Sequence, residues 1–257
     1  MKCWLTRLFL SLLAIPCGAK SLQVAVGLAL PPYVISEQNR GFELDIVREA
    51  LATQGHTITP VYAPFRRVPE LLREQQVDAA ITVTAQTVDN SAFLSTPYIT
   101  YRNVAVALSK RQLVLHSVSQ LASYSVLAFQ NAHRYLGAEF RNSVKQSPDY
   151  QEIARQSAQI TMLYGERVDV IVLDHNIFHY YRQQEQRVRT NQAVDIFPLF
   201  EPIHYQMAFR QRSWRDDFDR GLQQLRATGR YQQIVDQYLQ PEQVSFSNTE
   251  TAENLAQ

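Results

Sequence analysis

Short apolar segments and amphipathic segments alternate along most of this chain. Apolar runs at residues 22–27, 57–62 and 78–83 predict strands, and residues 42–51 and 66–75 between them carry apolar side chains at helical spacing. Strands that alternate with helices are typical of a parallel sheet covered on both faces. The first part of the chain therefore predicts a βαβαβ unit.

The same alternation continues after residue 100. A long apolar segment, residues 101–108, is expected to cross into a second unit, and residues 203–209 are expected to cross back. The remaining pattern predicts strands at residues 125–129 and 168–173 and helices at residues 132–140, 154–164, 175–187, 214–228 and 231–239.

A short sequence cassette occurs twice. Residues 74–81, EQQVDAAI, are echoed by residues 165–172, GERVDVIV, and each copy leads from an amphipathic helix into an apolar strand. Because open α/β sheets bind ligands beyond the carboxyl ends of their strands, two such units predict two lobes that face one cleft. We expect an α/β protein of two similar lobes: residues 20–105 with 206–240 form the first, and residues 106–205 form the second.

The first 19 residues have the composition of an export leader. Lys2 and Arg7 precede an apolar run at residues 8–15, and small residues follow near a cleavage point at Ala19. The run is too short for a permanent membrane anchor. We therefore expect an exported, periplasmic protein with the signal peptide removed.

Composition and charge narrow the function further. The 257 residues suffice for two small domains, and the net charge is +1, so the chain lacks the basic excess typical of nucleic-acid binding. Both cysteines, Cys3 and Cys17, lie in the leader, so we expect no disulfide and no cysteine metal site in the mature chain. The alternative is that the leader is cleaved before Cys17 and that Cys17 is then acylated. The polar residues 241–257 show no pattern and are expected to be a disordered tail.

Four segments together resemble one protein family. They are residues 22–27 with the following Pro32-Tyr33, residues 41–46 (GFELDI), residues 95–98 (STPY) and residues 222–239. Their order and separation are similar to those of the family 3 periplasmic solute-binding proteins, the polar-amino-acid receptors of ABC importers. The resemblance implies a periplasmic-binding-protein type II fold that closes on its ligand about a hinge. It also implies a small polar ligand, an ABC permease in the inner membrane as partner, a monomer, and no cofactor.

Two positions suggest how the ligand is held. Asp174 matches the aspartate that receives the α-ammonium group in this family, although an aspartate there also suits the N-cap of the next helix. Asn90 stands where the resemblance places an arginine that clamps the α-carboxylate, and a neutral amide cannot make that charge-assisted pair. Either the ligand lacks an α-carboxylate at this point or another cation replaces the arginine. We expect Arg67 to be that cation, ahead of Arg66 and Arg102, while a solvated surface charge is the ordinary role of each.

Five more residues complete the expected site. Thr82 and Thr84 follow the first cassette strand, where the family uses hydroxyl groups, and local backbone hydrogen bonds are the alternative. The rings of Tyr33 and Phe65 are expected to wall the pocket unless they pack in the core. Asn131 stands at a helix start that suits an anion.

Three functions stay open at this point: an importer receptor, a sensor for a chemoreceptor or kinase, and a dehydratase-like enzyme on the same fold. Glu43 is the conceivable catalytic carboxylate, and it suits the first turn of a helix equally well. His175 and His179 are spaced for a metal but have no third ligand, so we expect no metal. We predict a binding protein rather than an enzyme.

Overall fold

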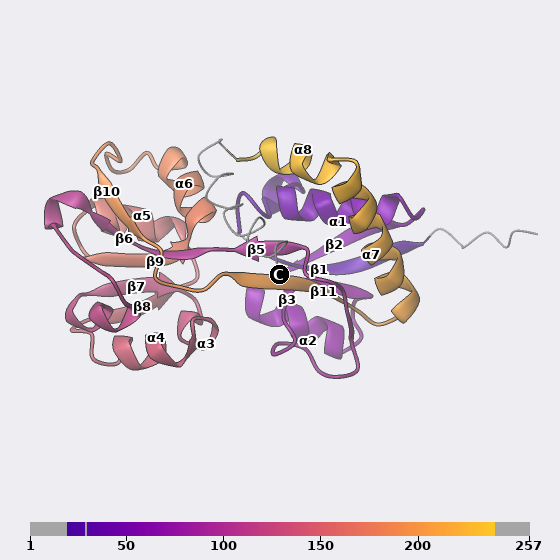
Figure 1. Ribbon diagram of the computed structural model, residues 1–257, viewed down its shortest axis with the longest axis horizontal. Coiled ribbons are helices and arrows are strands. Elements are labelled where there is room, and N and C mark those ends of the chain that lie inside the picture. Colours follow the sequence, from indigo (N-terminus) through magenta and orange to yellow (C-terminus); the bar gives the residue numbers. More distant parts are fainter. Residues whose placement is uncertain (1–19, 29, 240–257) are drawn as a thin grey trace, which may run out of the picture.

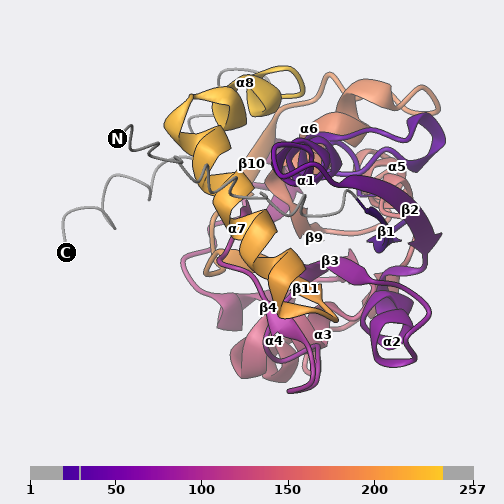
Figure 2. The ribbon, with the colours of Figure 1, turned by 90° about the vertical axis from the view of Figure 1, so that its right-hand side faces the viewer.

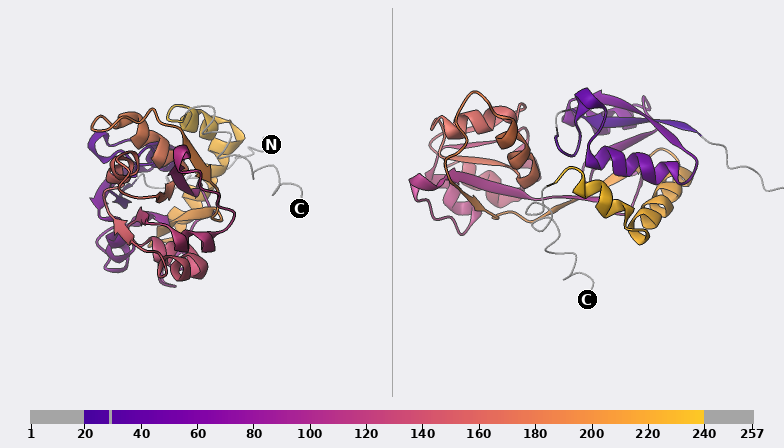
Figure 3. Two further views of the ribbon diagram at one scale, coloured as in Figure 1. Left: turned by 90° about the vertical axis from the view of Figure 1, so that its left-hand side faces the viewer. Right: turned by 90° about the horizontal axis from the view of Figure 1, so that it is seen from above.

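The computed structural model describes residues 20–28 and 30–239, so the predicted leader and tail lie outside the described residues. Two α/β lobes lie side by side and are joined by two crossing segments (Figure 1). The view from above shows the same division and the same two connections (Figure 3). The predicted fold class, a two-lobed α/β protein of the periplasmic-binding-protein type, is confirmed.

The first lobe is built on a mixed sheet with the strand order β2-β1-β3-β11-β4, and β5 also pairs with β11. Strand β1 is parallel to β2 and β3, and β11 is antiparallel to β3. The strands are β1 (Ser21–Gly27), β2 (Thr57–Ala63), β3 (Ala79–Val83), β4 (Phe93–Leu94), β5 (Ile99–Tyr101) and β11 (Ile203–Phe209).

The second lobe has a sheet with the strand order β10-β6-β9-β7-β8. Strand β9 lies at its centre, parallel to β7 and antiparallel to β6. The strands are β6 (Asn103–Leu108), β7 (Val126–Phe129), β8 (Tyr150–Ile153), β9 (Val170–Asp174) and β10 (Val194–Phe197). The chain changes sheets at Arg102, between β5 and β6, and returns between β10 and β11.

Helices cover both sheets. Helix α7 lies along the outside of the first lobe and packs on α1, as the end-on view shows (Figure 2). The first lobe carries α1 (Phe42–Ala52), α2 (Val68–Arg73), α7 (Arg212–Ala227) and α8 (Arg230–Asp236), with the 3₁₀ turns Ser36–Gln38 and Phe65–Arg67. The second lobe carries α3 (Ala132–Tyr135), α4 (Gly137–Val144), α5 (Ser157–Tyr164) and α6 (His175–Gln184), with the 3₁₀ turns Ser109–Arg111 and Val118–Ser123.

The repeated cassette folds in the same way in both lobes. Gln75 and Glu166 occupy the same cassette position, and both have a positive φ, 58° and 57°. Asp78 and Asp169 then each accept a backbone N–H bond of 3.0 Å from the neighbouring parallel strand region, from Gln23 and Ser125 respectively. The shared residues thus form the same local structure in both lobes: a residue with positive φ is followed by an aspartate that bonds to the neighbouring strand region.

The predicted elements differ from the structure mainly at their ends. The helix predicted at residues 132–140 is two helices, α3 and α4, since Gly137 has a φ of +86° at the junction. The segment predicted as one crossing strand is divided at Arg102 into β5 and β6. Strands β4, β8 and β10 were not predicted, because all three are short and none is fully buried. No helix of the described residues is long and apolar enough to cross a membrane.

Gly221 permits the close packing of α7 on α1. A Cβ at this position would lie 1.9 Å from the carbonyl oxygen of Ala50, which is backbone and cannot move aside alone. Gly221→Ala therefore should lower the free energy of unfolding by about 1–3 kcal/mol despite the better helix propensity of alanine. Urea unfolding measures this change. The exposed Gln223→Ala in the same helix is the control and should stay within about 0.5 kcal/mol of the wild type; equal stability of all three proteins would contradict this packing.

Candidate functional site

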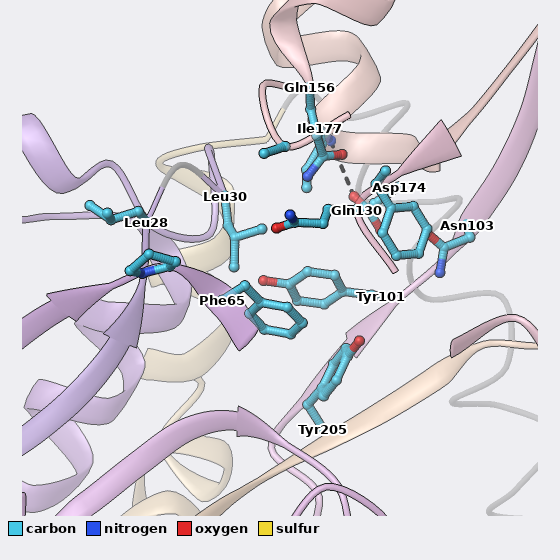
Figure 4. Close-up of a pocket in the computed structure, with 13 residues that line it drawn as sticks. Leu28, Leu30, Phe65, Tyr101, Asn103, Gln130, Gln156, Asp174, Ile177 and Tyr205 are labelled. Carbon is cyan, nitrogen blue, oxygen red and sulfur yellow. Dashed lines mark hydrogen bonds between the residues drawn. The ribbon is translucent and has the colours of Figure 1, made fainter. Parts of the chain in front are cut away.

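A cleft of about 270 Å³ lies where the two lobes meet. The first lobe supplies apolar and aromatic groups, whereas the second lobe supplies all four carboxamide or carboxylate side chains of the lining, Asn103, Gln130, Gln156 and Asp174 (Figure 4). The lining residues are Leu28, Leu30, Pro64, Phe65, Tyr101 and Tyr205 from the first lobe and Asn103, Phe129, Gln130, Ala154, Gln156, Asp174 and Ile177 from the second. An apolar wall with a few placed polar groups is the usual character of a small-molecule site.

Asp174 ends β9 and is the N-cap of α6. Its Oδ1 accepts the backbone N–H groups of Asn176 at 2.9 Å and Ile177 at 3.1 Å. Its Oδ2 accepts the N–H of Arg102 at 2.8 Å and the hydroxyl of Tyr33 at 3.0 Å. The carboxylate therefore joins the second lobe to the crossing strand and to a loop of the first lobe.

Burial controls the acidity of Asp174. Only 2 % of the residue is exposed, and this desolvation raises the pKa of the carboxyl to about 6, although the four hydrogen bonds oppose the shift. The N-cap interpretation is confirmed by these contacts. The same side chain also lines the cleft, so a ligand in the cleft would meet it.

The loop that carries Tyr33 is fixed by the start of α1. The carbonyl oxygen of Tyr33 accepts the N–H groups of Glu43 and Leu44, at 3.2 and 3.5 Å. Gly41 makes this approach possible, since its φ is +134° and a Cβ would lie 2.2 Å from that oxygen. The Tyr33 ring then stacks on Tyr101 at 3.8 Å between centroids. Tyr33 is buried and holds Asp174, and it does not line the cleft itself.

A second carboxylate lies behind the aromatic wall. Glu43 is fully buried and accepts hydroxyl groups from Thr82 at 2.6 Å, from Tyr101 at 2.7 Å and from Tyr98. Burial raises the pKa of Glu43, and the three hydroxyl bonds act in the opposite direction. Tyr101 therefore connects a buried acid to the cleft surface, because the same residue lines the cleft.

Phe65 reaches across the cleft toward the second lobe. Its ring lies 5.7 Å from that of Tyr135 in α3, centroid to centroid. Pro64 precedes it with an extended backbone, and the following 3₁₀ turn directs the ring into the cleft lining. Since these two rings belong to different lobes, their contact depends on how the lobes are placed.

Three of the predicted ligand contacts, Arg67, Thr82 and Thr84, bond to other parts of the first lobe. Arg67 pairs with Glu70 at 2.5 Å and with Glu74 at 3.3 Å, on the surface of α2. The hydroxyl of Thr82 is bonded to Glu43, and Thr84 bonds locally with Thr87. None of these side chains is among the described residues that line the cleft.

Asn90 is exposed in a turn of the first lobe. Its neighbours Asp89 and Ser91 line a separate hollow beside α2, together with Arg73 and Arg210. The turn therefore packs on the outer side of the lobe, and Asn90 is not part of the cleft lining.

Asn131 precedes α3, and a ligand anion was expected to bind at this helix start. In the structure the carboxylate of Glu152 lies there instead. Glu152 accepts the backbone N–H of Asn131 at 2.8 Å and that of His133 at 3.0 Å. It also bonds to His133 Nδ1 at 2.7 Å and to the hydroxyl of Tyr150 at 2.5 Å. Burial favours the neutral acid, but these hydrogen bonds prevail and hold the pKa of Glu152 below its usual value.

Sequence reasoning missed most of the polar lining. Asn103 and Tyr101 were assigned to a crossing strand without a role, and Gln156 was placed inside a predicted helix. The signal that points to them is position: each lies at the end of a strand or at the start of a helix, on the side where the lobes face each other. Of the predicted residues, Phe65 and Asp174 come together at the cleft, with Tyr33 behind Asp174.

No group of three or more His, Asp, Glu or Cys side chains suited to a metal occurs among the residues the structure describes. The rings of His175 and His179 lie 4.5 Å apart on α6. Burial, with a smaller effect of His179, lowers the pKa of His175 to about 4, so this residue is neutral at pH 7.

Comparisons with known proteins agree with this geometry. The model of the bacterial extracellular solute-binding proteins, family 3, matches residues 22–241. This match spans most of the sequence, and the chain belongs to that family. No curated protein matches the sequence.

Solved structures share the fold at low sequence identity. The ligand-binding core of GluR0 in complex with L-glutamate superposes with a TM-score of 0.71 at 17% identity, covering 86% of this chain and 98% of that one. A histidine kinase sensor domain with similarity to periplasmic binding proteins gives 0.70 at 19% identity, covering 85% and 96%. The substrate-binding protein of an amino acid ABC transporter gives 0.63 at 18% identity, covering 85% and 99%.

The raised pKa of Asp174 predicts a pH dependence of stability. An unfolded aspartate has a pKa of about 3.9, so the folded protein binds the extra proton between about pH 4 and pH 6. This contribution is present below pH 4 and is lost as the pH rises through 6, by about 3 kcal/mol in total. Asp174→Asn should remove it. Urea unfolding from pH 4 to 7 should show the variant gaining stability relative to the wild type as the pH rises, and a constant difference would contradict the shift.

Proposed function

We propose that the protein captures a small polar solute, an amino acid or an amino-acid-like compound, in the cleft between its lobes. The observation that carries the proposal is the division of the lining: the first lobe supplies Phe65, Tyr101 and Tyr205, and the second lobe supplies all four carboxamide or carboxylate side chains. A solute that touches both walls stabilises the closed arrangement over an open one, because only the closed arrangement offers all the contacts.

We further propose that the closed form delivers its solute to a permease of an ABC importer, and that the mature protein works as a periplasmic monomer after loss of residues 1–19. Membership of the family and the likeness to the substrate-binding protein of an amino acid ABC transporter support this assignment. A sensory role is the second candidate, because a histidine kinase sensor domain shares the fold equally well.

The hydrogen bonds of the two buried acids, Glu43 and Asp174, favour a binding function over a catalytic one. Glu43 is fully buried and bonded to three hydroxyl groups, and Asp174 accepts four hydrogen bonds. A general acid or base needs a carboxyl group that can exchange a proton with the substrate. Glu43 is not part of the described cleft lining, and Asp174 lines the cleft with both oxygens already accepting two hydrogen bonds each. Formation of a product from any bound compound would overturn this interpretation.

A thermal-shift screen tests solute binding. The mature protein is mixed with amino acids, amines, polyamines, di-acids and sugars. A ligand at about 100 times its Kd should add about 2.7 kcal/mol, which raises the Tm by about 5–11 °C for a chain of this size. Phe65→Ala should weaken binding of the active compound by about tenfold, because a ring that lines the cleft is lost.

The matched control for this variant is Phe93→Ala. The Phe93 ring is 40% exposed on β4 and is not part of the cleft lining. Equal loss of binding in both variants would argue for a general effect on folding and against the cleft as the site.

Deletion of the gene in its native host separates import from sensing. If the protein serves an importer, uptake of the labelled compound should fall at least tenfold and return on complementation. Unchanged uptake together with a lost chemotactic or transcriptional response to the compound would assign the protein to sensing.

A further inference from the structure

The polar wall of the cleft consists of carboxamides and one carboxylate. Asn103, Gln130 and Gln156 present side-chain amides, and Asp174 presents the acid. None of the described residues that line the cleft is Lys, Arg or His. These groups recognise hydrogen-bond donors and neutral acceptors, and they offer no charge-assisted pair to an anion.

Gln156 indicates that, among the described residues, the cleft lacks a hydrogen-bond donor at one position. Only 8% of the residue is exposed, and its Oε1 has no hydrogen-bond partner among the described residues. An unsatisfied buried acceptor destabilises the protein, so a ligand that donates a hydrogen bond here removes a penalty already present. Figure 4 shows Gln156 on the same side of the cleft as Asp174, with the rings of Phe65, Tyr101 and Tyr205 opposite.

In the second lobe, a carboxylate of the chain itself already occupies the backbone amides that could bind an anion. Glu152 occupies the backbone amides of Asn131 and His133 at the start of α3, next to the lining residue Gln130. A ligand carboxylate at these amides would have to displace Glu152 from four hydrogen bonds. It would also have to share the region with a carboxylate that is ionised at neutral pH.

Two further acids flank the cleft. Asp174 lines it, and Glu43 lies directly behind the hydroxyl of Tyr101, at 2.7 Å. A carboxylate placed beside Asp174 would add like charge in a largely desolvated site, where two like charges a few ångströms apart repel strongly. A cation or a neutral N–H donor would gain from the same charges.

We propose that the cleft binds a neutral or cationic nitrogen compound that lacks a carboxylate. Its planar or apolar body packs on Phe65, Tyr101 and Tyr205, and an N–H group donates to Gln156. This inference rests on the proposed solute-binding function and narrows its ligand class to amines and amides.

Matched pairs that differ only at the carboxyl group test the proposal. Isothermal titration at pH 7.5 compares histamine with histidine, tyramine with tyrosine, and nicotinamide with nicotinate. The member without a carboxylate should bind in at least one pair, and its acid should bind about 100-fold more weakly, as expected for a like-charge contact at an effective dielectric constant of about 20. Equal or tighter binding of the acid in the pair that responds would overturn the ligand class and leave solute binding intact.

Variants at Gln156 provide an independent test. Gln156→Leu keeps the volume and removes the acceptor, so the bound compound should lose at least fivefold in affinity. Gln156→Arg should reverse the preference within the pair toward the acid. Gln151→Leu is the control, since Gln151 is exposed on β8 and its side chain bonds only to Asp149 among the described residues.

The outcomes separate the two proposals. No response to any pair, with a carboxylate compound active in the broad screen, overturns the inference but supports solute binding. No response to any pair or to the broad screen overturns both.

Discussion

A buried carboxylate at the junction of the lobes is the constraint on which the site depends. Asp174 accepts backbone hydrogen bonds from the helix that follows it and from Arg102 on the crossing strand, and it accepts the hydroxyl of Tyr33 from the other lobe. Desolvation makes its ionised form costly, so the surrounding donors have to be in place. The position of α6, the path of the crossing segment at Arg102 and the orientation of the Tyr33 loop are therefore linked through one side chain.

Aromatic stacking extends this link into the first lobe. Tyr33 lies on Tyr101, and Tyr101 in turn donates to Glu43 at the start of α1. Two buried acids, one in each lobe, thus lie at the two ends of a stacked tyrosine pair. Tyr101 and Asp174 also line the cleft, so this chain of contacts reaches the surface that a solute would meet.

The fold followed from the sequence because hydrophobic periodicity and the repeated cassette are local signals. The strand at residues 203–209 was predicted with its observed ends, and the two cassettes form the same turn. The residues of the site could be predicted from the sequence only in part. Arg67 was predicted to bind a ligand carboxylate because of its charge. In the structure it pairs with Glu70 and Glu74, which lie three and seven residues further along the chain and therefore on the same side of the helix. Gln156 and Asn103 carry no motif, and only the meeting of the lobes gives them a shared surface.

Glu152 has a consequence for the unliganded protein. Helix starts in binding clefts commonly attract chloride, sulfate or buffer ions, which a solute then has to displace. Here a tethered carboxylate neutralises those amides permanently. Occupancy of the cleft by a solute should consequently respond little to the salt concentration of the surrounding medium.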